Sequence, residues 1–290
     1  MVQLPWANWN GAAMPLADVR VSVLDRGFLF GDGIYEVLRV YGERPFLLRE
    51  HMARLRRSLN EIQIKTDVDA LEIRMHATLR ESRIDGGLVY IQVTRGTAPR
   101  THKFPNPPVA PNELIYVDAI ETDPYGAYRE TGAKLLTVPD VRWRRCDIKS
   151  VNLLANCMAA QAATEAGCLE ALLVTADGTM TEGSHTSIFA VQGGRILATP
   201  LGPQILPGIT RGLVVKLAAR AGIAIEERSA KLAELDAIDE MFLTGTTSEV
   251  LPVTQVDGRP IGNGRPGPVT AKLVATYGEY VRDWLAGRVE

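Results

Sequence analysis

One lysine of the chain has the surroundings of a residue that forms Schiff bases. Lys149 follows two arginines, Arg144 and Arg145, and precedes a segment with helical spacing of apolar residues. We expect a helix over residues 151–166 with Ser150 as its N-cap, which would place the lysine at the positive end of that helix. Positive potential disfavours the ammonium form, and a free amine can form a Schiff base with a carbonyl. The ordinary alternative is a solvated surface lysine.

A lysine that holds a carbonyl cofactor such as pyridoxal phosphate needs a phosphate site nearby. Two stretches are candidates: residues 208–210, at a predicted helix start, and the hydroxyl-rich turn at residues 244–248. A helix start attracts anions through its free N–H groups and its dipole. Arg54 can add a charge-assisted hydrogen bond. The alternatives are a helix cap, a loop and an exposed helical arginine.

Such a cofactor also needs a partner for its pyridine nitrogen and an anchor for the substrate. Glu182, in the sequence Thr-Glu-Gly-Ser, is the candidate for the nitrogen, because a carboxylate there keeps the ring protonated. Arg100 and His102 lie on a long polar loop with prolines, and such loops often carry binding groups. A guanidinium can hold a carboxylate with two hydrogen bonds. A turn glutamate and a solvated basic loop are the alternatives.

The elements that must position these residues alternate between strands and helices. Residues 34–40 alternate as a strand does, so that Tyr35, Val37 and Arg39 project to one face. Further strands are expected at residues 87–95, 114–119, 134–138, 171–175, 187–191, 195–198, 223–227, 240–244 and 250–256, and helices at 47–62, 68–83, 208–220 and 268–284. Hairpins and crossovers together indicate two α+β domains with mixed sheets. We predict a small domain over residues 1–121, a linker over 122–126 and a larger cofactor-binding domain over 127–290.

Composition excludes several classes of protein. The chain has 290 residues, 46% hydrophobic and 23% charged, with a net charge of -2, which gives no electrostatic reason to expect nucleic acid or an anionic membrane as partner. No apolar run reaches the length of a membrane span, and no signal peptide is recognisable. Three cysteines without a C-x-x-C pair indicate reduced thiols and a cytoplasmic location. Four histidines show no metal-ligand spacing, so we expect no metal.

The stretches that carry the candidate residues occur together, and their order resembles that of the class IV, fold-type IV pyridoxal-phosphate aminotransferases. The resemblance covers nearly the full chain. The shared stretches are residues 25–27, 30–36, 51–55, 149–150, 181–184, 208–211 and 244–249. Within that class the chain is most similar to the D-amino-acid aminotransferases, because of residues 93–105 and 142–150. It departs from them at Gly245 and at residues 201–204, both near the expected pocket for the substrate side chain.

The resemblance implies a role for each candidate residue. Lys149 would hold pyridoxal 5′-phosphate and move the proton between the substrate Cα and the cofactor C4′, and Glu182 would face the pyridine nitrogen. The phosphate and the ring would be held by Arg54, Ile209, Thr210, Thr246, Thr247 and Leu206. The substrate carboxylate would be bound by Tyr35, Arg100 and His102, the last two from the second subunit of a homodimer, with Val37 and Arg39 lining the pocket.

The expected activity is transfer of the amino group of a D-amino acid, of the D-alanine, D-glutamate or D-aspartate type, to a 2-oxo acid such as 2-oxoglutarate or pyruvate. Alternatives on the same fold are a transaminase for branched-chain L-amino acids or (R)-amines and a lyase of the aminodeoxychorismate type. A carrier of pyridoxal phosphate without turnover is the alternative outside enzymes. Arg100 and His102 argue against the lyase, and the full set of substrate anchors argues against the carrier.

Overall fold

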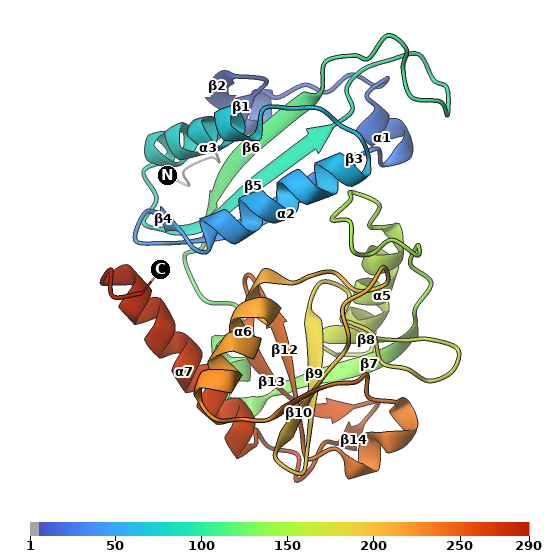
Figure 1. Cartoon of the computed structure of the whole chain (residues 1–290), viewed down its shortest axis with the longest axis vertical. Coiled ribbons are helices and arrows are strands. Elements are labelled where there is room, and N and C mark those ends of the chain that lie inside the picture. Colours follow the sequence, from blue (N-terminus) through green and yellow to red (C-terminus); the bar gives the residue numbers. More distant parts are fainter. Residues whose placement is uncertain (1–5, 290) are drawn as a thin grey trace. The chain divides into compact units, whose positions relative to one another are not determined.

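The computed structural model describes residues 6–289 and divides into two compact units (Figure 1). Unit 1 comprises Met1–Thr122 and Ile148–Asn152, and unit 2 comprises Asp123–Asp147 and Leu153–Glu290. The first change of unit falls at the predicted linker. Residues 148–152, in contrast, belong to unit 1, although the sequence analysis assigned them to the second domain. The physical reason is backbone pairing, because the N–H of Tyr35 donates to the carbonyl of Lys149 and that of Val151 to the carbonyl of Gly33.

Unit 1 contains a six-stranded sheet in the order β2-β1-β6-β5-β3-β4, and its neighbouring strands pair antiparallel over the described residues. The strands are β1 (Trp6–Trp9), β2 (Ala12–Pro15), β3 (Gly33–Tyr41), β4 (Arg44–Pro45), β5 (Gly86–Thr94) and β6 (Asn112–Ala119). In β3, Ile34, Glu36, Leu38 and Val40 are fully buried, while the residues between them are half-buried. This alternation confirms the predicted strand and the shared face of Tyr35, Val37 and Arg39.

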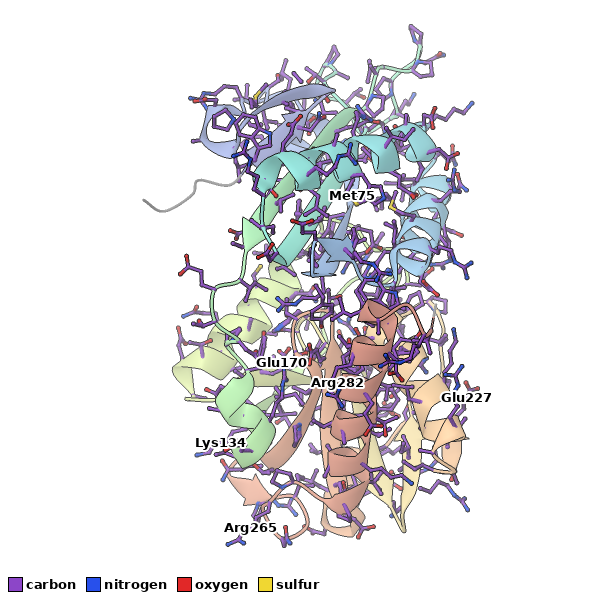
Figure 2. All side chains as sticks on the ribbon, turned by 90° about the vertical axis from the view of Figure 1, so that its left-hand side faces the viewer. Met75, Lys134, Glu170, Glu227, Arg265 and Arg282 are labelled. Carbon is purple, nitrogen blue, oxygen red and sulfur yellow. The ribbon has the colours of Figure 1, made fainter. Side chains whose placement is uncertain are left out.

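The helices of unit 1 are η1 (Leu16–Asp18), α1 (Arg26–Phe30), α2 (Leu48–Glu61) and α3 (Val68–Ser82). Of these, α2 and α3 cover the face of the sheet that Ile34 and Leu38 share. Apolar residues of α2 and α3 pack with those of β3, β5 and β6 in one core, and Met75 of α3 is labelled in Figure 2. Asp25 and Asp67 cap α1 and α3, respectively, since each side chain accepts from two backbone N–H groups of the first turn.

Unit 2 contains an eight-stranded mixed sheet with the path β11-β10-β9-β12-β13-β7-β8, and β14 pairs with β13. Its strands are β7 (Ala133–Pro139), β8 (Glu170–Val174), β9 (Ser187–Gln192), β10 (Arg195–Ala198), β11 (Ile225–Glu227), β12 (Glu240–Gly245), β13 (Glu249–Val256) and β14 (Arg259–Pro260). Its helices are α4 (Gly126–Thr131), α5 (Leu154–Glu165), α6 (Ile209–Arg220), η2 (Leu232–Ala237) and α7 (Pro268–Leu285). The α+β prediction is therefore confirmed.

The start of α5 corrects one prediction about the lysine. The helix begins at Leu154 with Leu153 as its N-cap, and no side chain caps it. Ser150 is not the N-cap; it is buried and forms an isolated bridge with Ile34 of β3. Lys149 therefore lies four residues before the N-cap of α5, and not directly at the helix start as we expected.

Candidate active site

Lys149 lies on the face of β3 that carries Tyr35. Its backbone carbonyl accepts from Tyr35 N at 3.0 Å, and its own N–H donates to Ser58 Oγ at 3.3 Å. The side-chain Nζ stands 4.2 Å from the ring centroid of Tyr35. Attraction between a cation and an aromatic face holds such an amine against the ring. Backbone pairing to β3 and packing on Tyr35 thus fix the lysine from both ends.

The same face carries a row of tyrosines. The rings of Tyr35 and Tyr90 stack with centroids 5.8 Å apart, and those of Tyr90 and Tyr116 with centroids 4.8 Å apart. Burial, and then the neighbouring phenols, raise the pKa of Tyr90 above its ordinary value. Val37 lies opposite Tyr90 across the β3–β5 ladder, and the Arg39 guanidinium lies 5.1 Å from the Tyr41 ring centroid. The structure therefore brings Lys149 and Tyr35 together, with Val37 and Arg39 further along the same strand face.

On the opposite, buried face of β3, Glu36 holds two side chains of α2. Its Oε1 accepts from Arg54 Nε at 2.7 Å and its Oε2 from Arg54 Nη2 at 2.8 Å, while His51 Nδ1 lies 2.8 Å from Oε2. Burial alone would raise the pKa of Glu36, but Arg54 and His51 lower it to about 2. Burial lowers the pKa of His51. The guanidinium proposed for the phosphate is therefore oriented by a buried carboxylate.

Glu36 and His51 were not predicted to act at the site. A signal was present for both. Glu36 occupies a buried position in an alternating strand, where an unpaired carboxylate is costly, and His51 and Arg54 are three residues apart on one helix face. Together these features would have indicated a buried ion pair between the strand and the helix.

Arg100 and His102 lie against one aromatic ring of unit 1. The Arg100 guanidinium carbon is 5.4 Å from the ring centroid of Phe30, and the His102 and Phe30 ring centroids are 5.6 Å apart. Both side chains belong to exposed residues of the connection between β5 and β6. The two predicted substrate anchors are therefore neighbours, packed on the last residue of α1.

In unit 2, Glu182 is a buried carboxylate with strong partners. Its Oε2 accepts from Arg142 Nη1 at 2.7 Å, and the N–H of Leu206 donates to Oε1 and Oε2 at 3.2 and 3.3 Å. Arg142 also makes a two-point pair with Asp140, through Nε to Oδ1 and Nη2 to Oδ2, both at 2.9 Å. Burial raises the pKa of Glu182, and Arg142 opposes that rise. Arg142 lies in the stretch 142–150 that marks the resemblance, but no role was predicted for it.

A second buried glutamate anchors the turn that follows Glu182. Glu170, labelled in Figure 2, accepts from Ser184 N at 2.9 Å and from Thr186 Oγ1 at 3.1 Å, and pairs with His185 Nδ1 at 2.9 Å. Burial would raise the pKa of Glu170, but His185 and Ser184 lower it to about 2. A Cβ on Gly183 would come within 2.1 Å of Thr186 Oγ1, so the turn admits only glycine there without moving.

The two phosphate candidates fit an anion in complementary ways. Gly208 is the N-cap of α6, a helix of 12 residues, and it offers no side chain to the N–H groups of Ile209 and Thr210. The turn after β12 carries Thr246 and Thr247, which are half-buried. Among the described residues, the buried hydroxyls of Thr244 and Ser248 at the two ends of this turn have no hydrogen-bond partner. Uncapped N–H groups and hydroxyls are the donors that a phosphate requires.

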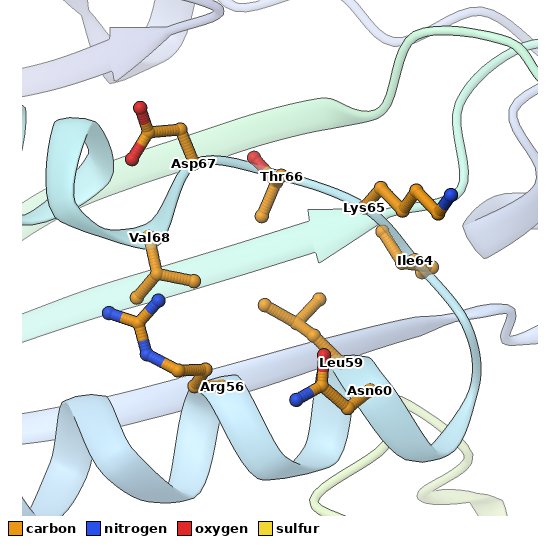
Figure 3. A pocket seen from close by; sticks show the side chains of 8 residues that line it. All are labelled: Arg56, Leu59, Asn60, Ile64, Lys65, Thr66, Asp67 and Val68. Atoms are coloured by element: carbon orange, nitrogen blue, oxygen red, sulfur yellow. The ribbon is translucent and has the colours of Figure 1, made fainter.

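A separate open pocket of about 640 Å³ lies between the end of α2 and the start of α3 (Figure 3). Arg56, Asn60, Lys65 and Asp67 supply polar groups to its lining. No residue proposed for the cofactor or the substrate lines it.

Comparison with known proteins gives one consistent picture. Residues 33–256 match the family described as amino-transferase class IV. The chain is 42% identical to the D-alanine aminotransferase of Bacillus licheniformis over 91% of this chain and 93% of that protein. It is 39% identical to the D-alanine aminotransferase of Staphylococcus aureus (strain N315) over 94% of this chain and 96% of that protein.

Solved structures of branched-chain amino acid aminotransferases are similar to this chain in fold. The T.th. enzyme, crystallised with pyridoxamine 5′-phosphate, has a TM-score of 0.87 and 27% identity, covering 100% of this chain and 96% of that chain. The Escherichia coli enzyme has a TM-score of 0.88 and 24% identity, covering 98% of this chain and 96% of that chain, so it bears on the fold alone. No helix within residues 6–289 combines the length and the apolar character needed to cross a membrane.

Proposed function

The chain belongs to the class IV aminotransferases, and we propose that it transfers the amino group of a D-amino acid such as D-alanine to a 2-oxo acid. The observation that carries this proposal is the pairing of Arg100 and His102 against one ring, Phe30. A guanidinium and an imidazole held side by side form a carboxylate trap, which an amino-acid substrate needs and a simple amine does not. The names of the relatives that the chain matches over nine-tenths of its length support the D-configuration.

The class uses pyridoxal 5′-phosphate, which supplies a carbonyl for attachment of an amine and a ring that withdraws electrons from the substrate Cα. We propose that Lys149 holds this cofactor through its amine and moves the proton at the substrate Cα. Glu182 would face the pyridine nitrogen, with Leu206 against the ring. The phosphate would be bound by Arg54, Ile209, Thr210, Thr246 and Thr247. The oriented Arg54, the uncapped α6 and the hydroxyls of residues 244–248 support this assignment.

Tyr35, Arg100 and His102 would bind the substrate carboxylate in this proposal, and Val37 and Arg39 would line the pocket. Lys149 packs on the Tyr35 ring, so the amine and one carboxylate donor share a face of β3. A proton delivered from one side of a planar centre gives one product configuration, which depends on where the carboxylate is held. A trap with several fixed donors therefore sets the hand of the substrate.

We also propose that the working form is a cytoplasmic homodimer in which Arg100 and His102 serve the neighbouring subunit's site. Several large apolar side chains are exposed in the single chain, which supports a further interface. Among them are Val23, Phe28, Leu154 and Met158, with exposed fractions of 70%, 72%, 76% and 62%. Burial of such side chains in a second copy is favourable by the hydrophobic effect.

Single-turnover spectroscopy of the protein loaded with pyridoxal 5′-phosphate tests the function. D-alanine, L-alanine, L-leucine and an aromatic (R)-amine are each mixed with it, and the change of the cofactor absorbance is followed in time. We expect D-alanine to react at least tenfold faster than either L-amino acid and faster than the amine. The branched-chain alternative, which the similar solved structures keep open, requires L-leucine to react fastest. That outcome would leave the family assignment and overturn the proposed substrate.

A further inference from the structure

We infer that Arg26 is a positioning residue for substrate recognition, because its guanidinium fastens the loop that carries Arg100 and His102. The inference rests on the proposed function, in which those two residues bind the substrate carboxylate. All groups involved lie in unit 1.

Arg26 contacts the loop backbone at Thr101 and His102. Its Nη1 donates to the carbonyl of Thr101 at 2.6 Å, and its Nη2 donates to the carbonyl of His102 at 3.4 Å. Thr101 is the residue between the two proposed anchors. The side chain of Arg26 is only 3% exposed, so these hydrogen bonds are shielded from water. A shielded charged donor makes stronger hydrogen bonds than one that competes with solvent.

The guanidinium is itself fixed by an ion pair. Arg26 Nε donates to Asp32 Oδ2 at 2.8 Å, and Arg95 makes a two-point pair with the same carboxylate at 2.7 and 2.9 Å. Arg95 further donates to the carbonyls of Ile62 and Gln63. Two buried cations on one carboxylate gain little net stability from their charges, but their hydrogen bonds allow few other geometries. The network therefore serves to fix position.

The aromatic contacts converge on the same loop. Arg26 and Phe30 are four residues apart on α1 and so lie on one side of the helix, with the guanidinium carbon 4.8 Å from the ring centroid. Phe30 is also the ring on which Arg100 and His102 pack. The Arg95 guanidinium carbon lies 3.5 Å from the ring centroid of Phe104, two residues after His102 in the loop. The short helix α1 thus supplies both Arg26, which donates to the loop backbone, and Phe30, on which Arg100 and His102 pack.

Loss of the Arg26 contacts should weaken binding of the substrate and leave binding of the cofactor unchanged. If the loop is released, Arg100 and His102 keep their chemistry but lose their fixed placement, and a displacement of about 1 Å can cost roughly 100-fold. We therefore expect Arg26→Gln to raise KM for D-alanine by about tenfold or more and to lower the ratio of D- to L-alanine kcat/KM. Cofactor affinity should not change, because Arg26 is assigned no role in holding it.

The test compares Arg26→Gln, Arg26→Lys and the control Arg20→Gln in the loaded enzyme. Arg20 is exposed and also donates to backbone carbonyls, those of Ala17 and Val19, outside the network. The measurements are KM and kcat for both alanine enantiomers, the dissociation constant of pyridoxal 5′-phosphate, and hydrogen exchange of residues 97–105 in the cofactor-free protein. Arg26→Lys keeps the charge but replaces the guanidinium with a single ammonium group, so its KM and loop exchange should lie between those of the wild type and Arg26→Gln. The control should behave as the wild type.

Faster exchange confined to residues 97–105, with the KM effect and unchanged cofactor affinity, would support the inference. It is overturned if either Arg26 variant leaves KM and loop exchange unchanged, or if cofactor affinity falls as much as KM rises, which would indicate general loss of structure. Arg100→Ala measured in parallel separates the two proposals. If Arg100→Ala leaves KM for D-alanine unaltered, the carboxylate trap itself is wrong; if it raises KM and Arg26→Lys does not, only the positioning role is wrong.

Discussion

At the scale of single residues, the charge of each buried carboxylate depends on its hydrogen-bond partners. Glu36 and Glu182 are both almost fully buried, yet their pKa values shift in opposite directions. Burial acts to raise the pKa in both cases. Glu36 has an arginine with two hydrogen bonds and a histidine to reverse the effect, whereas the single arginine of Glu182 is shared with Asp140. The partners of each carboxylate, and not burial alone, therefore decide its charge.

Because the pKa of Glu36 is low, the free energy of unfolding should decrease as the pH falls. The folded pKa of about 2 lies below the ordinary value of 4.5, so the unfolded chain binds the proton first as the pH falls. The stabilising contribution is complete above about pH 4.5 and is lost towards pH 2, and it amounts to about 3 kcal/mol. Glu36→Gln should flatten the pH dependence of the unfolding free energy in this window, as measured by urea unfolding at several pH values. The exposed Glu61→Gln on α2 is the control, and an unchanged slope in Glu36→Gln would contradict the assignment.

In the proposed site, where Glu182 faces the pyridine nitrogen, Arg142 should determine how well the carboxylate keeps that nitrogen protonated. Arg142→Gln removes the cation that opposes the effect of burial, so the pKa of Glu182 should rise further and the carboxyl should become neutral at higher pH. We expect weaker binding of pyridoxal 5′-phosphate, by about tenfold, and a less protonated ring.

The ¹⁵N chemical shift of a cofactor labelled at the ring nitrogen measures that proton directly. Arg145→Gln, which removes a neighbouring arginine paired with Asp147, is the control. A wild-type ring shift in Arg142→Gln would count against this role.

At the scale of elements, the turn between Glu182 and β9 is fixed by hydrogen bonds to the side chain of Glu170. It leaves no room for a Cβ atom at Gly183. Gly183→Ala should destabilise the protein by about 1–3 kcal/mol, because the added methyl group overlaps Thr186 Oγ1. The matched control is Gly212→Ala at the fourth residue of α6, where a Cβ meets nothing within 4 Å. It should stabilise by about 0.5–1 kcal/mol through helix propensity. Thermal unfolding of the two variants should shift in opposite directions; shifts of the same sign would refute the packing argument.

The elements also show which parts of the structure could be predicted from the sequence. Period-two alternation gave β3 and the face of Tyr35 correctly, and glycines at 208 and 193–194 marked the start of α6 and the β9–β10 hairpin. Local patterns failed at Ser150 and Val151, because their partner is β3, more than a hundred residues earlier. The pairs of Glu36 with Arg54 and of Arg142 with Glu182 were missed for a similar reason: spacing in the sequence does not report which buried charges meet.

At the scale of the whole molecule, the proposed dimer divides each site between two chains. Lys149→Ala should abolish transamination, since no other amine takes its place, and Arg100→Ala should be nearly inactive with D-alanine. After subunit exchange, an equimolar mixture of the two variants should recover up to about a quarter of wild-type activity. About half of its dimers are then mixed, and one of the two sites in each mixed dimer has both residues intact. Activity is compared with exchange measured by differently tagged chains, and each variant mixed with itself is the control. Complete exchange without recovery would contradict a shared site.

The segment that carries Lys149 has a consequence for how the protein is made. Residues 148–152 complete unit 1 by pairing with Gly33 and Tyr35, but the ribosome delivers them only after β7 of unit 2. When residues 1–122 have emerged, unit 1 therefore still lacks part of its structure. The backbone groups of β3 that pair with residues 149–151 remain without these partners until the later segment is made. A nascent chain that stops at Thr122 would lack both the lysine and the strand partner that covers this edge.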